Sequence, residues 1–175
     1  IKSKYLMYQL PGVDSTFYRA ISPWSSATNI VPRQDLTYSA EKSLNQFKFI
    51  DDGYLLTKGD YTFNHPVYVP RGQKLTIEEG TNLNFVDSGL LIVNGPIEMK
   101  GSFDQPIHFK SNDGKSGAIV VLQSKKRSKL SHVIFDNQNT MHYNGWNLTG
   151  AVTFYESDVD IADCQFNNNK CEDAL

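Results

Sequence analysis

Two stretches of this sequence repeat and decide the fold. Gly117-Ala-Ile-Val-Val-Leu-Gln-Ser124 matches Gly150-Ala-Val-Thr-Phe-Tyr-Glu-Ser157, and Leu130-Ser-His-Val-Ile-Phe-Asp-Asn137 matches Ile161-Ala-Asp-Cys-Gln-Phe-Asn-Asn168. The first pair is offset by 33 residues (117 to 150) and the second by 31 (130 to 161), and the difference falls in the Lys125-Lys-Arg127 corner. The repeating unit is therefore about 22 residues long, with an inserted loop at Asn139–Thr149 between the copies.

A unit this short cannot bury its apolar face alone, but stacked copies can. Each strand then pairs with its equivalent in the next copy at roughly 4.8 Å, and the inward side chains form one core. The expected neighbours are Val120 with Thr153 (a pair that can face inward or outward), Leu130 with Ile161, Val133 with Cys164, Phe135 with Phe166, and Asn137 with Asn168 at a left-handed corner. The alternative, a β-sandwich, predicts no fixed Phe-Asx-Asn repeat. We therefore predict an all-β, right-handed parallel β-helix, a solenoid.

The sequence pattern changes near residue 53, where short strand segments separated by turn residues begin to recur. Residues 1–52 are predicted to form a small cap or linker with a hairpin, Lys4–Leu10 and Thr16–Ile21 around Pro11-Gly12, and a short helical rhythm over Ser39–Lys48. Residues 53–175 are predicted to form the β-helix. Its expected strands are Asp60–Phe63, Val67–Val69, Lys74–Ile77, Leu83–Phe85, Leu90–Val93, Ile97–Met99, Ile107–Phe109, Ala118–Leu122, Leu130–Phe135, Val152–Tyr155 and Val159–Phe166.

Composition excludes several classes of protein. The 175 residues carry 17 Lys+Arg against 19 Asp+Glu, so the chain lacks the basic surplus of a nucleic-acid-binding protein. Apolar runs are only a few residues long, which excludes a membrane-inserted helix. Two cysteines are too few for a disulfide scaffold. The 14 asparagines and 12 glycines favour many tight corners.

Five segments resemble the repeat regions of exported bacterial right-handed parallel β-helix proteins. They are Gln73-Lys-Leu-Thr-Ile-Glu-Glu-Gly-Thr-Asn-Leu-Asn-Phe85, Gly101-Ser-Phe-Asp-Gln-Pro-Ile-His-Phe-Lys-Ser111, Leu148–Ser157, Asp160–Asn168 and Glu172–Leu175. Such regions occur beside spore-coat-type kinase-like modules and in polysaccharide-active enzymes. The resemblance implies an extracellular or cell-surface location. It also implies that the chain is a fragment whose coils continue beyond Leu175, and Ile1 at the first position agrees with a fragment or a processed product.

The inserted loop is the main candidate for ligand binding. Aromatic faces stack on sugar rings, and Tyr143 and Trp146 supply them, while His142 and Asn144 can bond hydroxyl groups. The expected ligand is a polysaccharide or a cell-surface glycan. The alternative is that Trp146 folds back and covers the flank of the coil.

Acidic residues near the C-terminus are the candidate metal ligands. Asp158 and Asp160 alternate with apolar residues and would both point outward, and Asp163, Glu172 and Asp173 follow. Related polysaccharide lyases bind Ca²⁺ through acids on one outer sheet, and Ca²⁺ prefers such oxygen ligands. The alternative is a row of solvated outward positions. No cofactor other than Ca²⁺ is expected.

Three functions remain open from the sequence. The first is a non-catalytic β-helix segment of an exported or surface protein, with a structural or carbohydrate-binding role. The second is part of a carbohydrate-active enzyme (lyase, epimerase or hydrolase) that uses outer-sheet carboxylates. The third is a phage or adhesin stalk. No catalytic residue is assigned, because no recognisable base lies with the acids, and the oligomeric state stays open.

Overall fold

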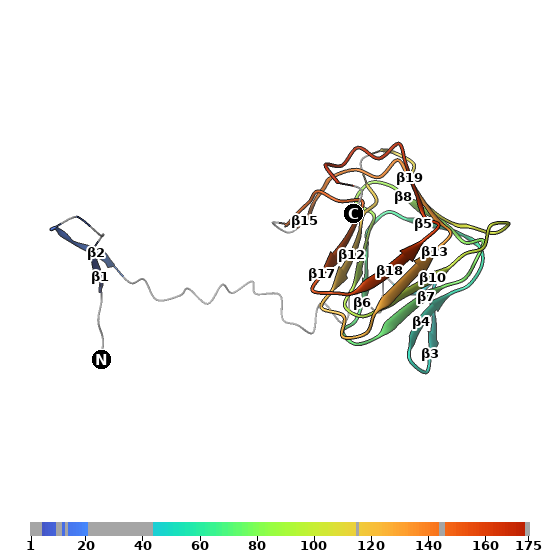
Figure 1. Cartoon of the computed structure of the whole chain (residues 1–175), viewed down its shortest axis with the longest axis horizontal. Helices are drawn as coiled ribbons and strands as arrows, with labels where there is room; N and C mark the ends of the chain where they lie inside the picture. Colours follow the sequence, from blue (N-terminus) through green and yellow to red (C-terminus); the bar gives the residue numbers. More distant parts are fainter. Residues whose placement is uncertain are drawn as a thin grey trace. The chain divides into compact units, whose positions relative to one another are not determined.

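The computed structural model describes residues 5–9, 12, 14–20, 44–114, 116–143 and 146–173. The chain divides into two compact units, Ile1–Arg33 and Gln34–Leu175. In the first, β1 (Tyr5–Gln9) and β2 (Thr16–Ala20) pair antiparallel, as the sequence predicts for the hairpin (Figure 1). The boundary between residues 52 and 53 stays a prediction. Of the expected helical stretch, residues 39–43 lie outside the described residues, and 44–47 form a turn.

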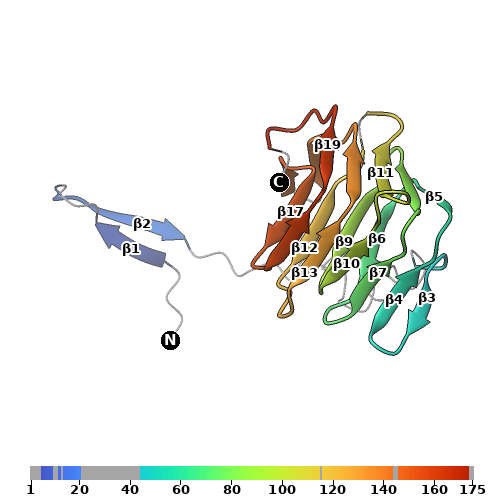
Figure 2. The same cartoon turned by 45° about the vertical axis from the view of Figure 1, so that its right-hand side comes forward.

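Three parallel sheets build the second unit. Sheet I contains, in spatial order, β18 (Val159–Ala162), β13 (Ser128–Ser131), β10 (Ile97–Lys100), β7 (Lys74–Ile77), β4 (Gly53–Leu56) and, antiparallel at the edge, β3 (Lys48–Ile50). Sheet II contains β19 (Gln165–Asn167), β14 (Val133–Asp136), β11 (Ile107–Ser111), β8 (Asn82–Phe85) and β5 (Asp60–Phe63). Sheet III contains β17 (Val152–Tyr155), β12 (Ile119–Leu122), β9 (Leu90–Val93) and β6 (Pro66–Val69). Figure 2 shows that neighbouring strands follow the sequence from teal to red.

The chain visits the sheets in a fixed order, I then II then III, and each visit adds one strand to the same edge. The register agrees with the sequence repeat: Val120 lies opposite Thr153, Leu130 opposite Ile161, and Phe135 opposite Phe166. These three expected pairings are confirmed. The part of the chain that the structure describes is all-β and contains no helix, so it offers no helix long and apolar enough to cross a membrane.

Residues in the left-handed backbone conformation divide two of the expected strands into shorter strands. The expected strand Leu130–Phe135 is wrong, because His132 has a φ of 50° and splits it into β13 and β14. The expected strand Val159–Phe166 is split in the same way at Asp163, with a φ of 53°. Asn137 and Asn168 also adopt the left-handed conformation predicted for them, with φ of 57° and 52°. A short polar side chain makes this conformation tolerable outside glycine.

One hydrophobic core is shared by all three sheets, and a stack of phenylalanines runs through it. Its members, with successive ring centroids 4.9–5.9 Å apart, are Phe47, Phe63, Phe85, Phe109, Phe135 and Phe166. Phe109 lies in register with Leu83 and not with Phe85, yet the rings meet, because residues two apart in a strand share a face. The stack therefore continues across a register shift.

Candidate functional site

The outer faces of the three sheets differ in chemistry, although the strands alternate inward and outward residues alike. Sheet I carries charges of both signs, sheet II carries amides and charges around a groove, and sheet III carries apolar residues. The function has to be sought on these faces, since the inward side chains are mainly apolar and form the shared core.

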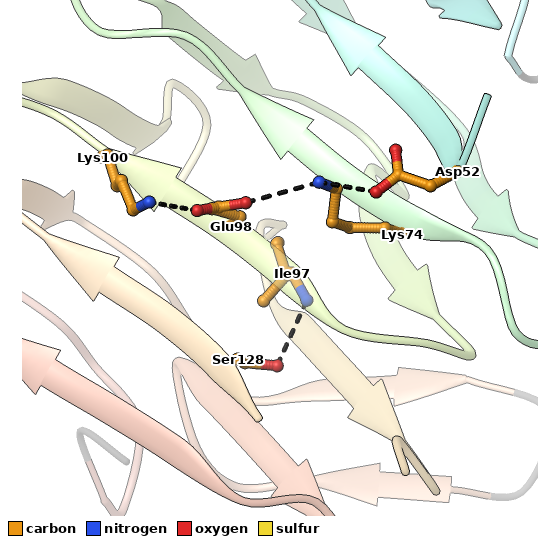
Figure 3. Close-up of polar contacts among 6 residues, drawn as sticks. All are labelled: Asp52, Lys74, Ile97, Glu98, Lys100 and Ser128. Atoms are coloured by element: carbon orange, nitrogen blue, oxygen red, sulfur yellow. Dashed lines mark hydrogen bonds and ion pairs between the residues drawn. The ribbon is translucent and has the colours of Figure 1, made fainter. Parts of the chain in front are cut away.

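On sheet I, charged side chains pair along the direction in which the strands stack. Lys74 Nζ lies 2.8 Å from Asp52 Oδ2 and 3.5 Å from Glu98 Oε2, and Lys100 pairs with the other oxygen of Glu98 (Figure 3). The hydrogen bond to Lys74 lowers the pKa of Asp52, and the same bond raises the pKa of Lys74. The hydrogen bond from Lys100 lowers the pKa of Glu98. These groups neutralise one another, so this face is suited to holding register rather than to binding a ligand.

Two of the predicted metal ligands belong to the same sheet. Arg127 Nη1 donates to Asp160 Oδ1 at 2.7 Å, and Arg127 Nη2 donates to Asp158 Oδ2 at 3.5 Å. The hydrogen bond to Asp160, together with the negative charges of Asp160 and Asp158, raises the pKa of the guanidinium. The two carboxylates therefore lie together, as predicted, but a guanidinium occupies the space between them.

The other three predicted ligands are not brought to them. Asp163 lies beside His132, with Oδ2 4.0 Å from Nε2. The exposed Glu172 and Asp173 follow β19, and the backbone of Asp173 bonds near Gly150. Within the described ranges, no three His, Cys, Asp or Glu side chains are grouped so as to hold a metal ion.

On sheet III, the inserted loop covers an apolar outer face. It forms a hairpin of β15 (Met141–Tyr143) and β16 (Trp146–Leu148), and Met141 and Leu148 are only 6% and 7% exposed. They pack on outward residues of the sheet, namely Leu90, Ile92, Ala118 and Val120. The hairpin therefore closes a second, smaller core.

The predicted sugar-binding residues divide between this core and solvent. Tyr143 is half-buried against Tyr68, and their hydroxyls are hydrogen-bonded. Burial, with the bond to Tyr143, raises the pKa of Tyr68. Trp146 is 44% exposed and His142 is exposed. Asn144 lies outside the described residues. The hairpin thus has a packing role through Tyr143 and leaves Trp146 and His142 accessible.

Sheet II carries the open groove, of about 620 Å³, over β11, β14 and β19. Two outward rows cross the strands in register. The first row is Asp60, Asn82, His108, Ile134 and Gln165, and the second is Thr62, Asn84, Lys110, Asp136 and Asn167. The groove is lined mainly by His108, Lys110, Ile134, Asp136, Asn167 and Asn168. Asn168 Nδ2 donates to Asp136 Oδ1 at 3.1 Å, which holds that carboxylate at the rim.

A second groove, of about 570 Å³, lies between sheets I and II near Lys58 and Glu98. Its charged groups Lys58, Glu98 and Lys100 are already engaged, and its Thr76 Oγ1 is buried without a hydrogen-bond partner among the described residues. Lys58 Nζ donates to Gln105 Oε1 at 2.5 Å, and Glu98 holds two lysines. The groove on sheet II therefore offers more accessible hydrogen-bonding groups.

Sequence reasoning missed this groove. Asp136 lies 26 residues after Lys110 in the sequence (136 − 110), and no motif links it to Lys110 and His108. A signal was present, because each lies one residue from an inward phenylalanine, Phe109 or Phe135, and so has to face outward. That signal places them on one face only once the register between strands is known.

Both cysteines are free and half-buried at the edge of the core. Burial raises the pKa of the Cys164 thiol, which keeps it protonated and weakly reactive. They add no chemistry to the groove.

No protein-family model, curated protein or solved structure matches this chain.

Proposed function

We propose that the chain from residue 53 onward is a right-handed parallel β-helix of an exported or surface protein, and that the groove on sheet II binds carbohydrate without catalysis. The support for the β-helix is the fixed visiting order of three parallel sheets around a shared core. The support for binding is the groove itself. Among the described residues, the hairpin covers the outer face of sheet III, and ion pairs engage the charged groups on the outer face of sheet I. In the same part of the chain, the outer face of sheet II has neither.

The chemistry of the groove suits a chain of hydroxyl groups. Amide side chains such as Asn84 and Asn167 both donate and accept hydrogen bonds, as sugar hydroxyls do. Lys110 and Asp136 add charge-assisted bonds, which are roughly twice as strong as neutral ones. Because these groups recur at roughly 4.8 Å from strand to strand, the rows favour an extended ligand lying across the strands.

The presence of a carboxylate opposite a lysine favours a second candidate function. Asp136 and Lys110 are direct cross-strand neighbours, with His108 on the adjacent row. Glycosidases ordinarily use two carboxylates. Asp136 supplies one, and Lys110 supplies an amine, so the pair offers groups for general acid–base chemistry. A carbohydrate-active enzyme is therefore the alternative, and release of reducing ends from a bound polysaccharide would establish it.

The test is affinity electrophoresis of the full chain in gels that contain neutral or acidic polysaccharides, followed by titration of any that retard it. We expect Lys110→Ala to weaken binding at least about tenfold, the loss of one charged hydrogen bond. The matched control is Lys129→Ala, another exposed lysine, on the outer face of sheet I.

A third variant separates the groove from the hairpin. Trp146→Ala is expected to leave binding unchanged if sheet II carries the ligand. Loss of binding in Trp146→Ala with full binding in Lys110→Ala would move the site to the hairpin. Failure of every polysaccharide to retard the protein would contradict the carbohydrate proposal.

A further inference from the structure

Two tyrosines that are far apart in the sequence meet on the outer face of sheet III. Tyr68 lies in β6, and Tyr143 lies 75 residues later, in β15 of the inserted hairpin. Their hydroxyls are hydrogen-bonded, and their ring centroids lie 6.4 Å apart with the ring planes at 51°. The pair therefore joins the hairpin to the strand of sheet III that lies farthest from β17.

The hairpin extends over several layers to make this contact. It follows β14 and precedes β17 in the chain, yet its buried side chains, Met141 and Leu148, pack on residues of β9 and β12. The contact of Tyr143 with Tyr68 then reaches β6. In stacked repeats each layer ordinarily contacts only its neighbours. The hairpin therefore bridges layers that the sheets connect only one after another.

The pair combines access to solvent with a contact between two phenols. Tyr68 and Tyr143 are both half-buried, so a small oxidant can reach them from solvent. The ring contacts of Tyr8, Tyr54 and Tyr61, in contrast, are with phenylalanines, which have no hydroxyl group to oxidise. The pair of tyrosines on sheet III therefore meets the geometric requirement for coupling of two phenoxyl radicals.

The coupling reaction joins two phenols by a carbon–carbon bond. Each phenol loses one electron and one proton, and the unpaired electron of the resulting radical is shared between the oxygen and the ring carbons ortho to it. One ortho carbon of each ring forms the new bond, and the hydrogen on each of these carbons then passes to the oxygen, which restores both phenols. Hydrogen peroxide accepts the two electrons and two protons and is reduced to two molecules of water. Because the ortho carbons adjoin the carbon that carries the hydroxyl, a hydroxyl contact brings them close together.

We propose that Tyr68 and Tyr143 form a site of oxidative modification, at which hydrogen peroxide, acting through a haem peroxidase, couples the two rings into dityrosine. The bond fastens the hairpin to β6 over the apolar outer face of sheet III. It also closes the chain between the two residues into a covalent loop, which restricts the unfolded chain and so stabilises the folded one. The proposal does not depend on the groove on sheet II or on its ligand.

The experiment treats the full chain, at low protein concentration, with a haem peroxidase and hydrogen peroxide. After reduction of any disulfide, the monomer is isolated under denaturing conditions. We expect dityrosine fluorescence in this monomer, a mass lower by two hydrogen atoms and, after digestion with trypsin, a cross-linked pair of peptides, residues 59–71 and 130–170. The thermal midpoint of the cross-linked protein should rise by at least about 5 °C.

Phenylalanine variants assign the bond to its two residues. Tyr68→Phe and Tyr143→Phe keep the rings but lose the hydroxyls, and each should lower the dityrosine yield in the monomer at least about tenfold, since groups held in contact react much faster than groups that meet by chance. Tyr61→Phe and Tyr155→Phe are matched controls on the same two tryptic peptides, and should leave the yield unchanged. Thermal midpoints measured before oxidation show that each variant is folded.

Three results would overturn the proposal. The first is an undiminished yield of dityrosine in the monomer of Tyr68→Phe or Tyr143→Phe. The second is absence of the cross-linked peptide pair after oxidation of the unsubstituted chain. The third is formation of the bond with no rise in thermal midpoint, because the cross-link would then not fasten the hairpin in its folded position.

Discussion

The two ends of the parallel sheets bury the same kinds of residue to different extents. Phe63, in the first strand of sheet II, is 1% exposed because Phe47 stacks on its outer side and Phe85 on its inner side. Phe166, in the last described strand of sheet II, stacks on Phe135 alone among the described residues and is half-buried. The inward pattern alone therefore does not bury a side chain. A layer is needed on both sides, as in other stacked repeats.

This difference also bears on local stability. In a stacked architecture each layer contacts only its neighbours, so the layer with one neighbour has the lowest cost of opening. Among the described residues, the layer of β18 and β19 has one neighbouring layer, whereas β4 and β5 are covered by β3, Leu44 and Phe47. We expect opening to begin at β18 and β19.

The largest expected change in the free energy of unfolding comes from substitutions in the phenylalanine stack. Phe109→Ala removes a fully buried ring from between Phe85 and Phe135, and should lower the free energy of unfolding by about 3–5 kcal/mol. Phe166→Ala removes a half-buried ring with one neighbour, and should lower it by about 1–2 kcal/mol. Urea unfolding followed by circular dichroism measures both.

Equal losses for Phe109→Ala and Phe166→Ala would show that the ring of the outermost described layer is covered as fully as a ring in the middle of the stack. A smaller loss for Phe109→Ala than for Phe166→Ala would contradict the single shared core. Phe103→Ala is the matched control, because that ring is 88% exposed and should leave the free energy of unfolding unchanged.

Much of the stacking could be predicted from the sequence, because two copies share the Phe-Asx-Asn pattern at nearly constant spacing. The pairing of Phe135 with Phe166 follows from that pattern alone. The earlier layers could not be aligned in the same way. Between Phe85 and Phe109 the register shifts by two residues, so the aromatic stack persists while the sequence offset changes. The corners at His132 and Asp163 were also missed, since neither residue type marks a left-handed turn as clearly as glycine.

The site was harder to predict than the fold. The sequence indicates the hairpin as a candidate site because Tyr143 and Trp146 are aromatic residues in a polar loop. The apolar outer face that the hairpin covers is formed only when the strands of sheet III come together. The groove residues Lys110 and Asp136 are ordinary outward residues in sequence. They become a site only because their strands are neighbours.

A smaller effect on stability is expected at the left-handed corners, where Asn137 lies in an inner layer and Asn168 in the outermost described layer. Asn137→Ala places a Cβ-only side chain at a φ of 57° and removes the bond from Asn137 Nδ2 to the Ser111 carbonyl, 2.8 Å long. We expect a loss of about 1–2 kcal/mol in the free energy of unfolding. Asn168→Ala changes the same corner in the outermost layer and should cost less, since both partners of its side-chain bond are more exposed. Asn137→Gly is the control, because glycine tolerates this φ, and a loss as large as that of alanine would show that backbone strain is not involved.

The smallest expected effect concerns pH, and it contrasts the ion pairs near the two ends of sheet I. The pKa values of Asp52 and Glu98 lie below their ordinary values of 3.8 and 4.5, so both carboxylates bind protons less readily in the folded chain. Their contribution to stability is therefore present above those values and is lost as the pH falls through the lowered pKa values. The pKa of Lys74 lies above 10.5, so its contribution is complete below that value and is lost only as the pH rises beyond it.

Lys74→Met should accordingly flatten the fall in thermal midpoint between pH 5 and about 2, by a small amount because the pairs are largely solvated. Arg127→Met removes the corresponding pairs beside β18, where both carboxylates are more exposed than Glu98. It should change the acid limb less than Lys74→Met does, since solvent screens the more exposed pairs more strongly. A larger change in the acid limb for Arg127→Met than for Lys74→Met would mean that ion pairs contribute more to the stability of the outermost described layer than to that of the covered end.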